Sequence, residues 1–382
     1  MAASDARPIL ILNTGSSTFK WALLSDDGKF LGTGTEQWEA DDALTRKTQI
    51  VAKLHALPPC RAVGHRIVHG GLVFEDSVVI DSHVRREFES LLTLDLLHMR
   101  PALCALDAAR DRFPDVPHVA AFDTAFHRTM SKAAAGYALP TEWTQRWGLR
   151  RFGFHGLSIS WSVDWMRRNG QPFPKRMVVA HLGSGCSVTA VLDGRSVDTS
   201  MGFTPLEGLM MGTRSGSVDP GLLLHLQTHH GITAHEMEDT LTNRSGLLGV
   251  SGVSSDLREV LKAADEGNSN AWLAYDRFIF CARRAVGAAA GVLGGVDALV
   301  FTGGIGEHQP RVRQDIAIAF DGLQIDEAAN LGVHAGGTSD AGEGRRISTE
   351  KSRISAVVIR AREDLVLLRE VLRFAAAGTT GA

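Results

Sequence analysis

Two apolar runs near the start of the chain are separated by a short polar turn. Residues 9–24 read ILILNTGSSTFKWALL, so the runs flank a turn of asparagine, threonine, glycine and serine residues. Apolar runs with β-branched and aromatic members on both sides of a Gly/Ser turn are typical of a β-hairpin. We therefore predict two antiparallel strands here, joined by a turn rich in hydroxyl and amide groups.

Farther along the chain, helical and extended patterns alternate. Residues 81–94 and 100–113 carry apolar side chains at helical spacing, the second with Pro101 near its first turn. Apolar runs predict strands within four further segments: 116–122, 177–185, 296–306 and 354–364. This alternation predicts an α/β architecture, in which ligands gather where strands end. Four residues stand at such ends: Asp123, Gly183, Gly303 and Glu363.

The opening hairpin has a second copy in the middle of the chain. Residues 11–29 and 179–196 both read as strand, Gly/Ser turn and strand, and Gly15 aligns with Gly183. Each copy then reaches an Asp-Gly pair, which is typical of another hairpin turn. Two half-molecules with the same hairpin predict a duplicated fold that holds a ligand between its halves.

Composition narrows the class of protein. The chain has 382 residues, of which 44% are hydrophobic and 22% charged, so it is long enough for two domains with separate cores. A formal net charge of -3 gives no reason to expect nucleic acid or an anionic membrane as partner. The four cysteines lack CxxC spacing, and no apolar segment reaches the length of a membrane-spanning helix. We therefore expect a cytoplasmic protein that contacts neither membrane nor nucleic acid.

Three glycine-bearing loops follow predicted strands, at Gly15, at 183–185 and at 303–306. Such loops let the backbone approach a ligand closely and present N–H groups to phosphate oxygens. The first is neither a Walker loop nor a dinucleotide turn, and Lys20 supplies a positive charge beside it. A solvated hairpin with an exposed lysine is the alternative interpretation of that loop alone.

Charged side chains in small-residue settings point to anion chemistry. Arg66 stands in GHRIVHGG and Arg214 in MGTRSGS, while Asp123 ends a strand. Arginine suits bidentate contact with carboxylate or phosphate, and two arginines with a metal ion suffice to catalyse phosphoryl transfer. The alternative for each arginine is an ordinary loop salt bridge. His155, in RRFGFHG, fits either chemistry or packing.

Seven segments together identify a family. In chain order they read LNTGSSTFK, GHRIVHGG, FDTAFH, RRFGFHG, DTSMGFTPLEGLMMGTRSG, SGVSSDLRE and FTGGIGE. Their order and spacing resemble the acetate kinase family over nearly the whole chain. That family belongs to the sugar kinase, heat-shock chaperone and actin superfamily. The resemblance implies a duplicated two-domain actin-like ATPase fold with ribonuclease H-like halves and an active site in the interdomain cleft. The domains would be 1–147, completed by a C-terminal helix at 365–382, and a nucleotide-binding domain at 148–364.

The resemblance also implies roles for individual residues. The catalytic set would be Arg66, Asp123, His155 and Arg214. In it the arginines hold the acyl carboxylate and the moving phosphoryl group, which His155 hydrogen-bonds in the transition state. An apolar pocket for the acetate methyl would consist of Val68, Leu97, Phe154 and Pro205. Phosphate and nucleotide would contact Asn13, Thr18, Lys20, His181, Gly183, Ser184, Gly185, Asp256, Arg258, Gly303, Gly304 and Ile305. The metal positions would be Asn13 and Glu363, and Glu363 would pair with Asp123 to orient the arginines.

The implied activity is reversible phosphoryl transfer from ATP to acetate, giving acetyl phosphate and ADP by direct in-line transfer. The expected cofactor is Mg²⁺, with Mn²⁺ as a substitute, and the expected assembly is a homodimer. A carboxylate acceptor is already ionised near neutral pH, so no strong base is needed. Four alternatives stay open: a propionate or butyrate kinase, an acyl kinase with another phosphoryl donor, a sugar-kinase-like enzyme with Asp123 as base, and a non-catalytic nucleotide-binding module.

Overall fold

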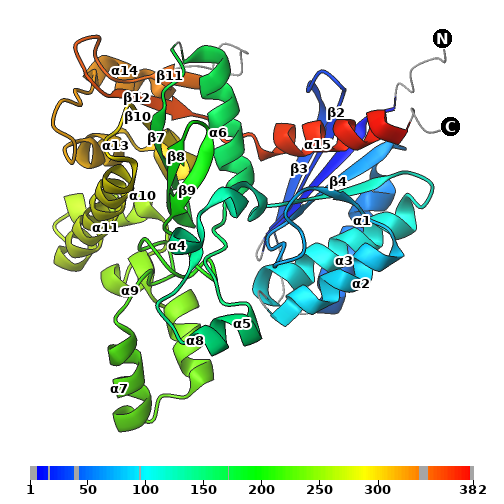
Figure 1. Cartoon of the computed structure of the whole chain (residues 1–382), viewed down its shortest axis with the longest axis horizontal. Helices are drawn as coiled ribbons and strands as arrows, with labels where there is room; N and C mark the ends of the chain where they lie inside the picture. Colours follow the sequence, from blue (N-terminus) through cyan, green and yellow to red (C-terminus); the bar gives the residue numbers. More distant parts are fainter. Residues whose placement is uncertain are drawn as a thin grey trace. The chain divides into compact units, whose positions relative to one another are not determined.

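The structure is a computed structural model that describes residues 7–15, 18–37, 43–93, 96–170, 172–334 and 343–378. The chain divides into two compact units (Figure 1). The first unit comprises Met1–Phe126 and Arg362–Ala382, and the second comprises His127–Ala361. No helix in the described part of the chain is long and apolar enough to cross a membrane.

The first unit is built on a six-stranded sheet with the order β3-β2-β1-β4-β6-β5. Its strands are β1 (Ile9–Thr14), β2 (Thr18–Leu24), β3 (Phe30–Gln37), β4 (Ala62–Ile67), β5 (Val78–Val79) and β6 (His118–Phe122). β1 pairs antiparallel with β2, which confirms the predicted opening hairpin, and parallel with β4. Ser16 and Ser17 of its turn lie outside the described residues.

Helices cover this sheet on both faces. They are α1 (Ala43–Ala56), α2 (Ser82–Ser90), η1 (Leu91–Thr93), α3 (Leu96–Arg112), η2 (Ala125–Thr129, shared with the second unit) and α15 (Glu363–Gly378). Val63 of β4 packs in a core cluster with residues of α1 and α3. Gly64 points the other way, and a side chain there would collide with Val371 of α15. Glycine at this position therefore lets α15 lie directly on the sheet.

The helix expected around Pro101 begins earlier than the sequence pattern indicates. α3 starts at Leu96, so Pro101 lies inside it rather than near its first turn. Proline lacks the N–H that an interior position normally donates, which makes it a poor guide to this helix start. Met99, one turn into the helix, is fully buried in a core cluster with Ile67 and Phe122.

The second unit repeats the topology of the first. Its sheet has the order β11-β12-β10-β7-β8-β9. The strands are β7 (Arg176–Leu182), β8 (Cys186–Leu192), β9 (Arg195–Thr199), β10 (Ala298–Thr302), β11 (Gly344–Arg346) and β12 (Ser355–Ile359). β7 pairs antiparallel with β8 and parallel with β10, as β1 does with β2 and β4. The repeated hairpin thus occupies the same place in both sheets, which confirms the duplication predicted from sequence.

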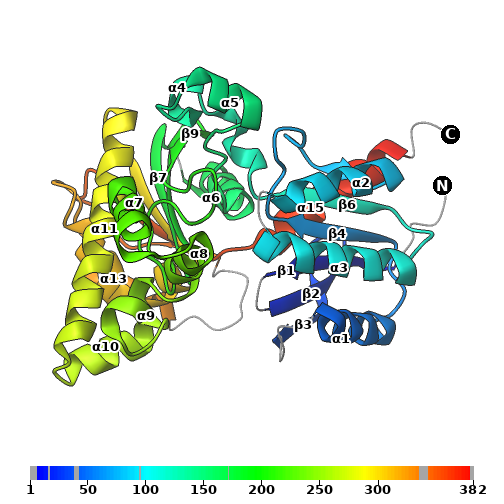
Figure 2. The ribbon, with the colours of Figure 1, turned by 90° about the horizontal axis from the view of Figure 1, so that it is seen from below.

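Two long helices sandwich the second sheet. α11 (Ser269–Leu293) contacts β7 and β8, and α6 (Gly156–Asn169) contacts β7 and β10 from the opposite side (Figure 2). The other helices are α4 (Lys132–Ala135), α5 (Thr141–Trp147), α7 (Pro220–His230), α8 (Ala234–Asn243), α9 (Gly246–Ser251), α10 (Leu257–Asp265), α12 (Gly303–His308), α13 (Pro310–Ala317), α14 (Glu327–Leu331) and η3 (Gly332–His334). The loops that follow the strands lie at the edges of this sheet, outside the layers of helices.

The division between the units differs from the sequence-based boundary at 147. Residues 127–147 group with the second unit because their polar side chains bond to it. The His127 ring lies 2.9 Å from Ser196 Oγ of β9, and the Tyr137 hydroxyl donates to Glu207 Oε2 at 2.6 Å. At the other end, the helix expected at 365–382 begins at Glu363 and groups with the first unit.

Candidate active site

In the first unit, the site begins with a buried ion pair. Arg66 lies on β4, on the face that α15 covers, and Asp123 directly follows β6. Arg66 Nε donates to Asp123 Oδ1 at 3.0 Å and Arg66 Nη2 to Oδ2 at 2.5 Å. The Asp123 side chain is only 1% exposed, so its charge depends on this bidentate partner. The fork geometry fixes the plane of the guanidinium.

Asn13 and Glu363 extend this pair into a chain of four groups. Arg66 Nη1 donates to Asn13 Oδ1 at 2.9 Å, and Asn13 Nδ2 donates to Glu363 Oε2 at 2.9 Å. Glu363 Oε2 also lies 3.6 Å from Arg66 Nε. Parallel strands β1 and β4 and the start of α15 thus bring together residues as distant in sequence as 13 and 363. We call this set the arginine cluster.

The electrostatics of the arginine cluster keep its cation charged. Burial would lower the pKa of Arg66, but the carboxylates of Asp123 and Glu363 outweigh it and raise that pKa above its ordinary value. Apart from Arg66, the cluster offers carboxylate and amide oxygens, which are the hard metal ligands that Mg²⁺ prefers. In the described part of the chain, no group of three or more His, Cys, Asp or Glu could hold a metal ion by itself. That donor set fits Mg²⁺ held by one or two carboxylates together with substrate phosphates.

The other sequence candidates of the first unit lie around this cluster. Lys20 is the strand partner of Asn13 across the β1–β2 hairpin and is exposed. The Thr18 carbonyl accepts a 2.8 Å bond from Gly15 N, which tightens the turn. Val68 is buried just beyond β4. Leu97 lies in α3, but its side chain lies outside the described part of the chain.

In the second unit, two stacked histidines face a glycine turn. The rings of His155 and His181 stack with centroids 4.0 Å apart. Ser187 Oγ lies 2.9 Å from His155 Nδ1, and Ser158 Oγ lies 2.9 Å from His181 Nδ1. Each serine holds the inner nitrogen of its ring. The Nε2 atom of His155 faces Gly185, where a Cβ would lie 3.4 Å away.

Arg214 reaches the same glycine turn from a long loop. A Cβ on Gly185 would lie 3.6 Å from Arg214 Nη1, so a larger residue would crowd both Arg214 and His155. Arg214 Nη1 donates to the carbonyl of Pro205 at 3.1 Å. The loop itself is tied to the turn by a 3.1 Å bond from Gly212 N to Ser184 O. Phe154, buried at 1% exposure, precedes His155.

The glycines of α12 lie beside this turn. Gly303 has a φ of 76°, and a Cβ there would lie 2.7 Å from the carbonyl oxygen of Leu182, so no side chain fits. A Cβ on Gly183 would lie 3.9 Å from Gly304 N. α12, which also contains Ile305, thus begins against the end of β7. His155, His181, Arg214 and the two glycine turns form one assembly, which we call the histidine cluster.

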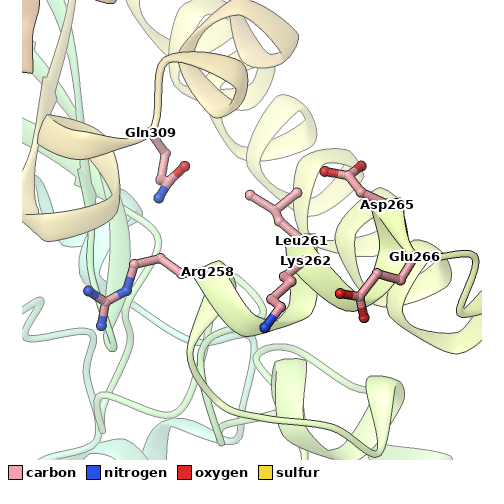
Figure 3. Close-up of a pocket in the computed structure, with 6 residues that line it drawn as sticks. All are labelled: Arg258, Leu261, Lys262, Asp265, Glu266 and Gln309. Carbon is pink, nitrogen blue, oxygen red and sulfur yellow. The ribbon is translucent and has the colours of Figure 1, made fainter.

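A pocket of about 510 Å³ lies between α10 and the end of α12. Figure 3 shows its lining: Arg258, Leu261, Lys262, Asp265, Glu266 and Gln309. Asp256 caps α10 and accepts from Arg258 Nε at 3.0 Å, and this partner lowers the pKa of the Asp256 carboxyl. Gln309 directly follows α12. The pocket therefore lies between Arg258 and the end of the helix that begins at Gly303.

Several site residues were not predicted from sequence. Ser158 and Ser187 hold the histidine rings, and their only sequence signal was a small hydroxyl near a glycine motif. Glu207 accepts from Tyr137 Oη and from Arg151 Nη2, both at 2.6 Å. Because Glu207 stands two residues after Pro205, these contacts anchor the loop that carries Arg214. No local pattern marks such a contact between distant segments.

Comparisons with known proteins identify the family of the chain. The acetokinase family model matches residues 35–369. The acetate kinase of Caldanaerobacter subterraneus subsp. tengcongensis is 39% identical over 398 residues, which cover 95% of this chain and 97% of that protein. The acetate kinase of Clavibacter michiganensis subsp. michiganensis is 40% identical over 397 residues, covering 95% of this chain and 98% of that protein.

Solved structures show the same likeness. The acetate kinase of Porphyromonas gingivalis superposes with a TM-score of 0.84 at 33% identity, covering 97% of this chain and 100% of that one. A propionate kinase from Francisella tularensis subsp. tularensis gives 0.84 at 34% identity, covering 96% and 99%. These matches confirm the predicted fold class, an α/β duplicated two-domain actin-like ATPase fold.

Proposed function

The chain belongs to the acetokinase family, and we propose that it transfers a phosphoryl group reversibly from ATP to acetate, giving acetyl phosphate and ADP. The observation that carries this proposal is the arginine cluster, in which Arg66 is held by Asp123 and Asn13 and remains a cation. Such a fixed cation suits a planar anion that accepts two hydrogen bonds.

The chemistry asks for charge neutralisation and alignment rather than for a base. The acetate carboxylate is ionised at neutral pH and attacks the terminal phosphorus in line with the departing ADP. We assign Arg66 and Arg214 to the acyl carboxylate and the moving phosphoryl group. Asp123 orients Arg66 through its bidentate contact. We assign to His155 the tautomer in which Nδ1 accepts from the Ser187 hydroxyl, 2.9 Å away, and Nε2 carries the proton. In that tautomer His155 donates to the phosphoryl oxygens as their charge rises.

We assign Asn13 and Glu363 to a Mg²⁺ ion, for which Mn²⁺ substitutes. The oxygen donors of the arginine cluster fit such an ion, as described above. When bound, the ion supplies positive charge to the phosphates. Glu363 also lies 3.6 Å from Arg66 Nε, so we assign its carboxylate to the orientation of Arg66 as well as to the ion.

The acceptor specificity is assigned to apolar side chains. Val68, Leu97, Phe154 and Pro205 are proposed to contact the acetate methyl, and burial of Val68 and Phe154 supports an apolar surface. Propionate is a second candidate acceptor, because a structural neighbour at 34% identity is titled a propionate kinase. One methylene is worth about 1–3 kcal/mol in such a pocket, so both acids should react at different rates.

For the donor, we assign the nucleoside of ATP to the pocket beside α10 and α12 (Figure 3). Arg258 lines this pocket, and Asp256 caps the same helix. We assign Gly303, Gly304 and Ile305 to the nucleotide as well, because they begin α12 and Gln309, directly after that helix, lines the pocket. The phosphates would run along the backbone of Gly183, Ser184 and Gly185 past His181, and Thr18 and Lys20 would contact them from the β1–β2 hairpin. Helix starts and glycine turns present N–H groups to such oxygens.

The assembly and location are also proposals. We propose a homodimer, supported by α7, on which no residue is buried although it carries four leucines. Leu222 and Leu224 are 48% and 61% exposed. Contact with a second copy of the chain would remove this apolar surface from water. We propose a cytoplasmic location, supported by the four cysteines at positions 60, 104, 186 and 281, none of which forms a disulfide.

The decisive experiment is trapping of the acyl phosphate with hydroxylamine. Acetate and propionate are each tested with ATP, GTP or pyrophosphate in the presence of Mg²⁺. We expect product from acetate and ATP, and a loss of kcat/KM of about 100-fold or more in Arg66→Ala. The matched control is Arg353→Ala, which removes an exposed arginine paired only with the surface carboxylate of Asp321. Turnover of Arg66→Ala within a few fold of the parent would overturn the assignment.

A further inference from the structure

His127 is a buried histidine whose two ring nitrogens have different partners. It lies in η2 and is fully buried. Its Nε2 lies 2.9 Å from the carbonyl oxygen of Phe154, and its Nδ1 lies 2.9 Å from Ser196 Oγ. A carbonyl oxygen can only accept, so Nε2 carries the proton and donates. In the neutral ring Nδ1 then accepts from the Ser196 hydroxyl.

The backbone that His127 touches is unusual. Phe154 lies between Gly153 and His155, which have φ angles of 75° and 60°. A left-handed conformation is strained for a non-glycine residue and persists only where surrounding contacts enforce it. The His127 ring also packs on Gly153, where a Cβ would lie 2.7 Å from its Cδ2 and Cγ atoms. The ring therefore contacts both residues that precede His155.

The conformation of His155 determines where its ring points. His155 is the N-cap of α6, and its carbonyl accepts the first helical bond, from Ile159 N at 3.0 Å. With an ordinary right-handed or extended backbone, the side chain would leave Ser187 and turn away from the glycine turn at Gly185. The conformation of the peptide between Phe154 and His155 thus sets the direction of the His155 ring.

We propose that His127 is a positioning residue for His155: by donating from Nε2 to the Phe154 carbonyl, it holds the strained peptide that aims His155 Nε2 at the phosphoryl group. This inference rests on the proposed function, since it takes His155 as the donor to that group. Burial lowers the pKa of His127 to about 4, so the ring stays neutral at working pH and Nδ1 keeps accepting from Ser196 while Nε2 donates.

Two conservative substitutions separate positioning from mere packing. In His127→Gln the side-chain amide can occupy the place of Nε2, whereas in His127→Asn it can reach only the place of Nδ1. We expect His127→Asn to lower kcat about 10- to 100-fold, because a displacement of about 1 Å costs that much. KM for acetate and for ATP should change less than about 3-fold. His127→Gln should stay within about 3-fold of the parent in kcat.

A matched control lies in the first unit. His118 is also buried and its Nε2 lies 3.0 Å from a backbone carbonyl, that of Phe113. His118→Asn should leave kcat within about 3-fold of the parent, since nothing catalytic follows Phe113. In a His155→Ala background, adding His127→Asn should cost no further activity, as expected for residues that act as one unit. An equal kcat loss in both backgrounds would overturn the proposal.

A readout without turnover separates this inference from the proposed function. The Cε1–H resonance of His155, assigned by its disappearance in His155→Ala, is followed by NMR in the parent and each variant. We expect His127→Asn to shift it and His127→Gln and His118→Asn to leave it. Should the parent show no kinase activity, the proposed function fails while this readout still decides the position of His155. If His127→Asn fails to fold, Ser196→Ala, which removes the bond to Nδ1, must shift the resonance; an unmoved resonance overturns the proposal.

Discussion

Buried neutral histidines make the free energy of unfolding of this protein depend on pH. Burial lowers the pKa of His127 from the ordinary value of 6.5 to about 4, whereas the unfolded chain restores the ordinary value. Above pH 6.5 both states hold this ring neutral. Between pH 6.5 and 4 the unfolded state binds more protons, so the free energy of unfolding falls as the pH falls. Below pH 4 both states are protonated and the loss levels off.

The size of the effect follows from the two pKa values. At pH 5 the unfolded ring is protonated roughly 30 times more often than neutral, while the folded ring remains about nine-tenths neutral. The free energy of unfolding is then about 2 kcal/mol lower than at pH 7.5 because of this residue alone. In the first unit, burial also lowers the pKa of His65 and of His118, and His65 Nε2 lies 2.9 Å from His118 Nδ1. They act in the same direction as His127.

The assay compares the parent with His127→Gln, which keeps the hydrogen bond but does not titrate. Urea unfolding at pH 7.5, 6 and 5 is followed by tryptophan fluorescence, and hydrogen exchange of the β8 and β9 amides reports on the second unit alone. We expect the parent to lose about 2 kcal/mol more than the variant between pH 7.5 and pH 5. Histidines common to both proteins cancel in this difference. Parallel losses in the two proteins would refute the assignment of a depressed pKa to His127.

Two further substitutions test the second unit. Glu207→Gln should lower kcat/KM for acetate about 10-fold, because it weakens the contacts to Tyr137 and Arg151 that anchor the loop of Arg214; steady-state kinetics measure this, and an unchanged kcat/KM would contradict it. If the proposed homodimer forms through α7, Leu224→Asp should give a monomer in light scattering, whereas Leu31→Asp, on exposed β3, should not change the mass. Dimers persisting in Leu224→Asp would remove α7 from the interface.

The strands and their duplication were predictable because their signal is local. β1 and β7 each combine an apolar run with a glycine turn, and the repeat was visible without any contact information. Arg66, Asp123 and His155 were predicted through their motifs. That Asn13 joins Arg66 to Glu363 depends on strand order and on the return of α15, which composition and periodicity do not encode.

The residues missed by sequence analysis act across distant segments. His127 lies inside the motif FDTAFH, yet its partners Phe154 and Ser196 are 27 and 69 positions away. A buried histidine with two partners looks the same in sequence as an exposed one. The grouping of residues 127–147 with the second unit has no sequence signal for the same reason, since the contacts of these residues are with segments that come later in the chain.

The return of α15 to the first sheet sets an order of completion during synthesis. Residues 363–378 leave the ribosome after the whole second unit, so the face of β4 around Gly64 stays uncovered until then. Glu363 arrives with this helix and is the last carboxylate to join Arg66 and Asn13. A nascent or prematurely ended chain therefore has an exposed apolar face, which chaperones and proteases can recognise, together with an incomplete charge cluster. Assembly of the first unit and of its arginine cluster is therefore completed in one late step.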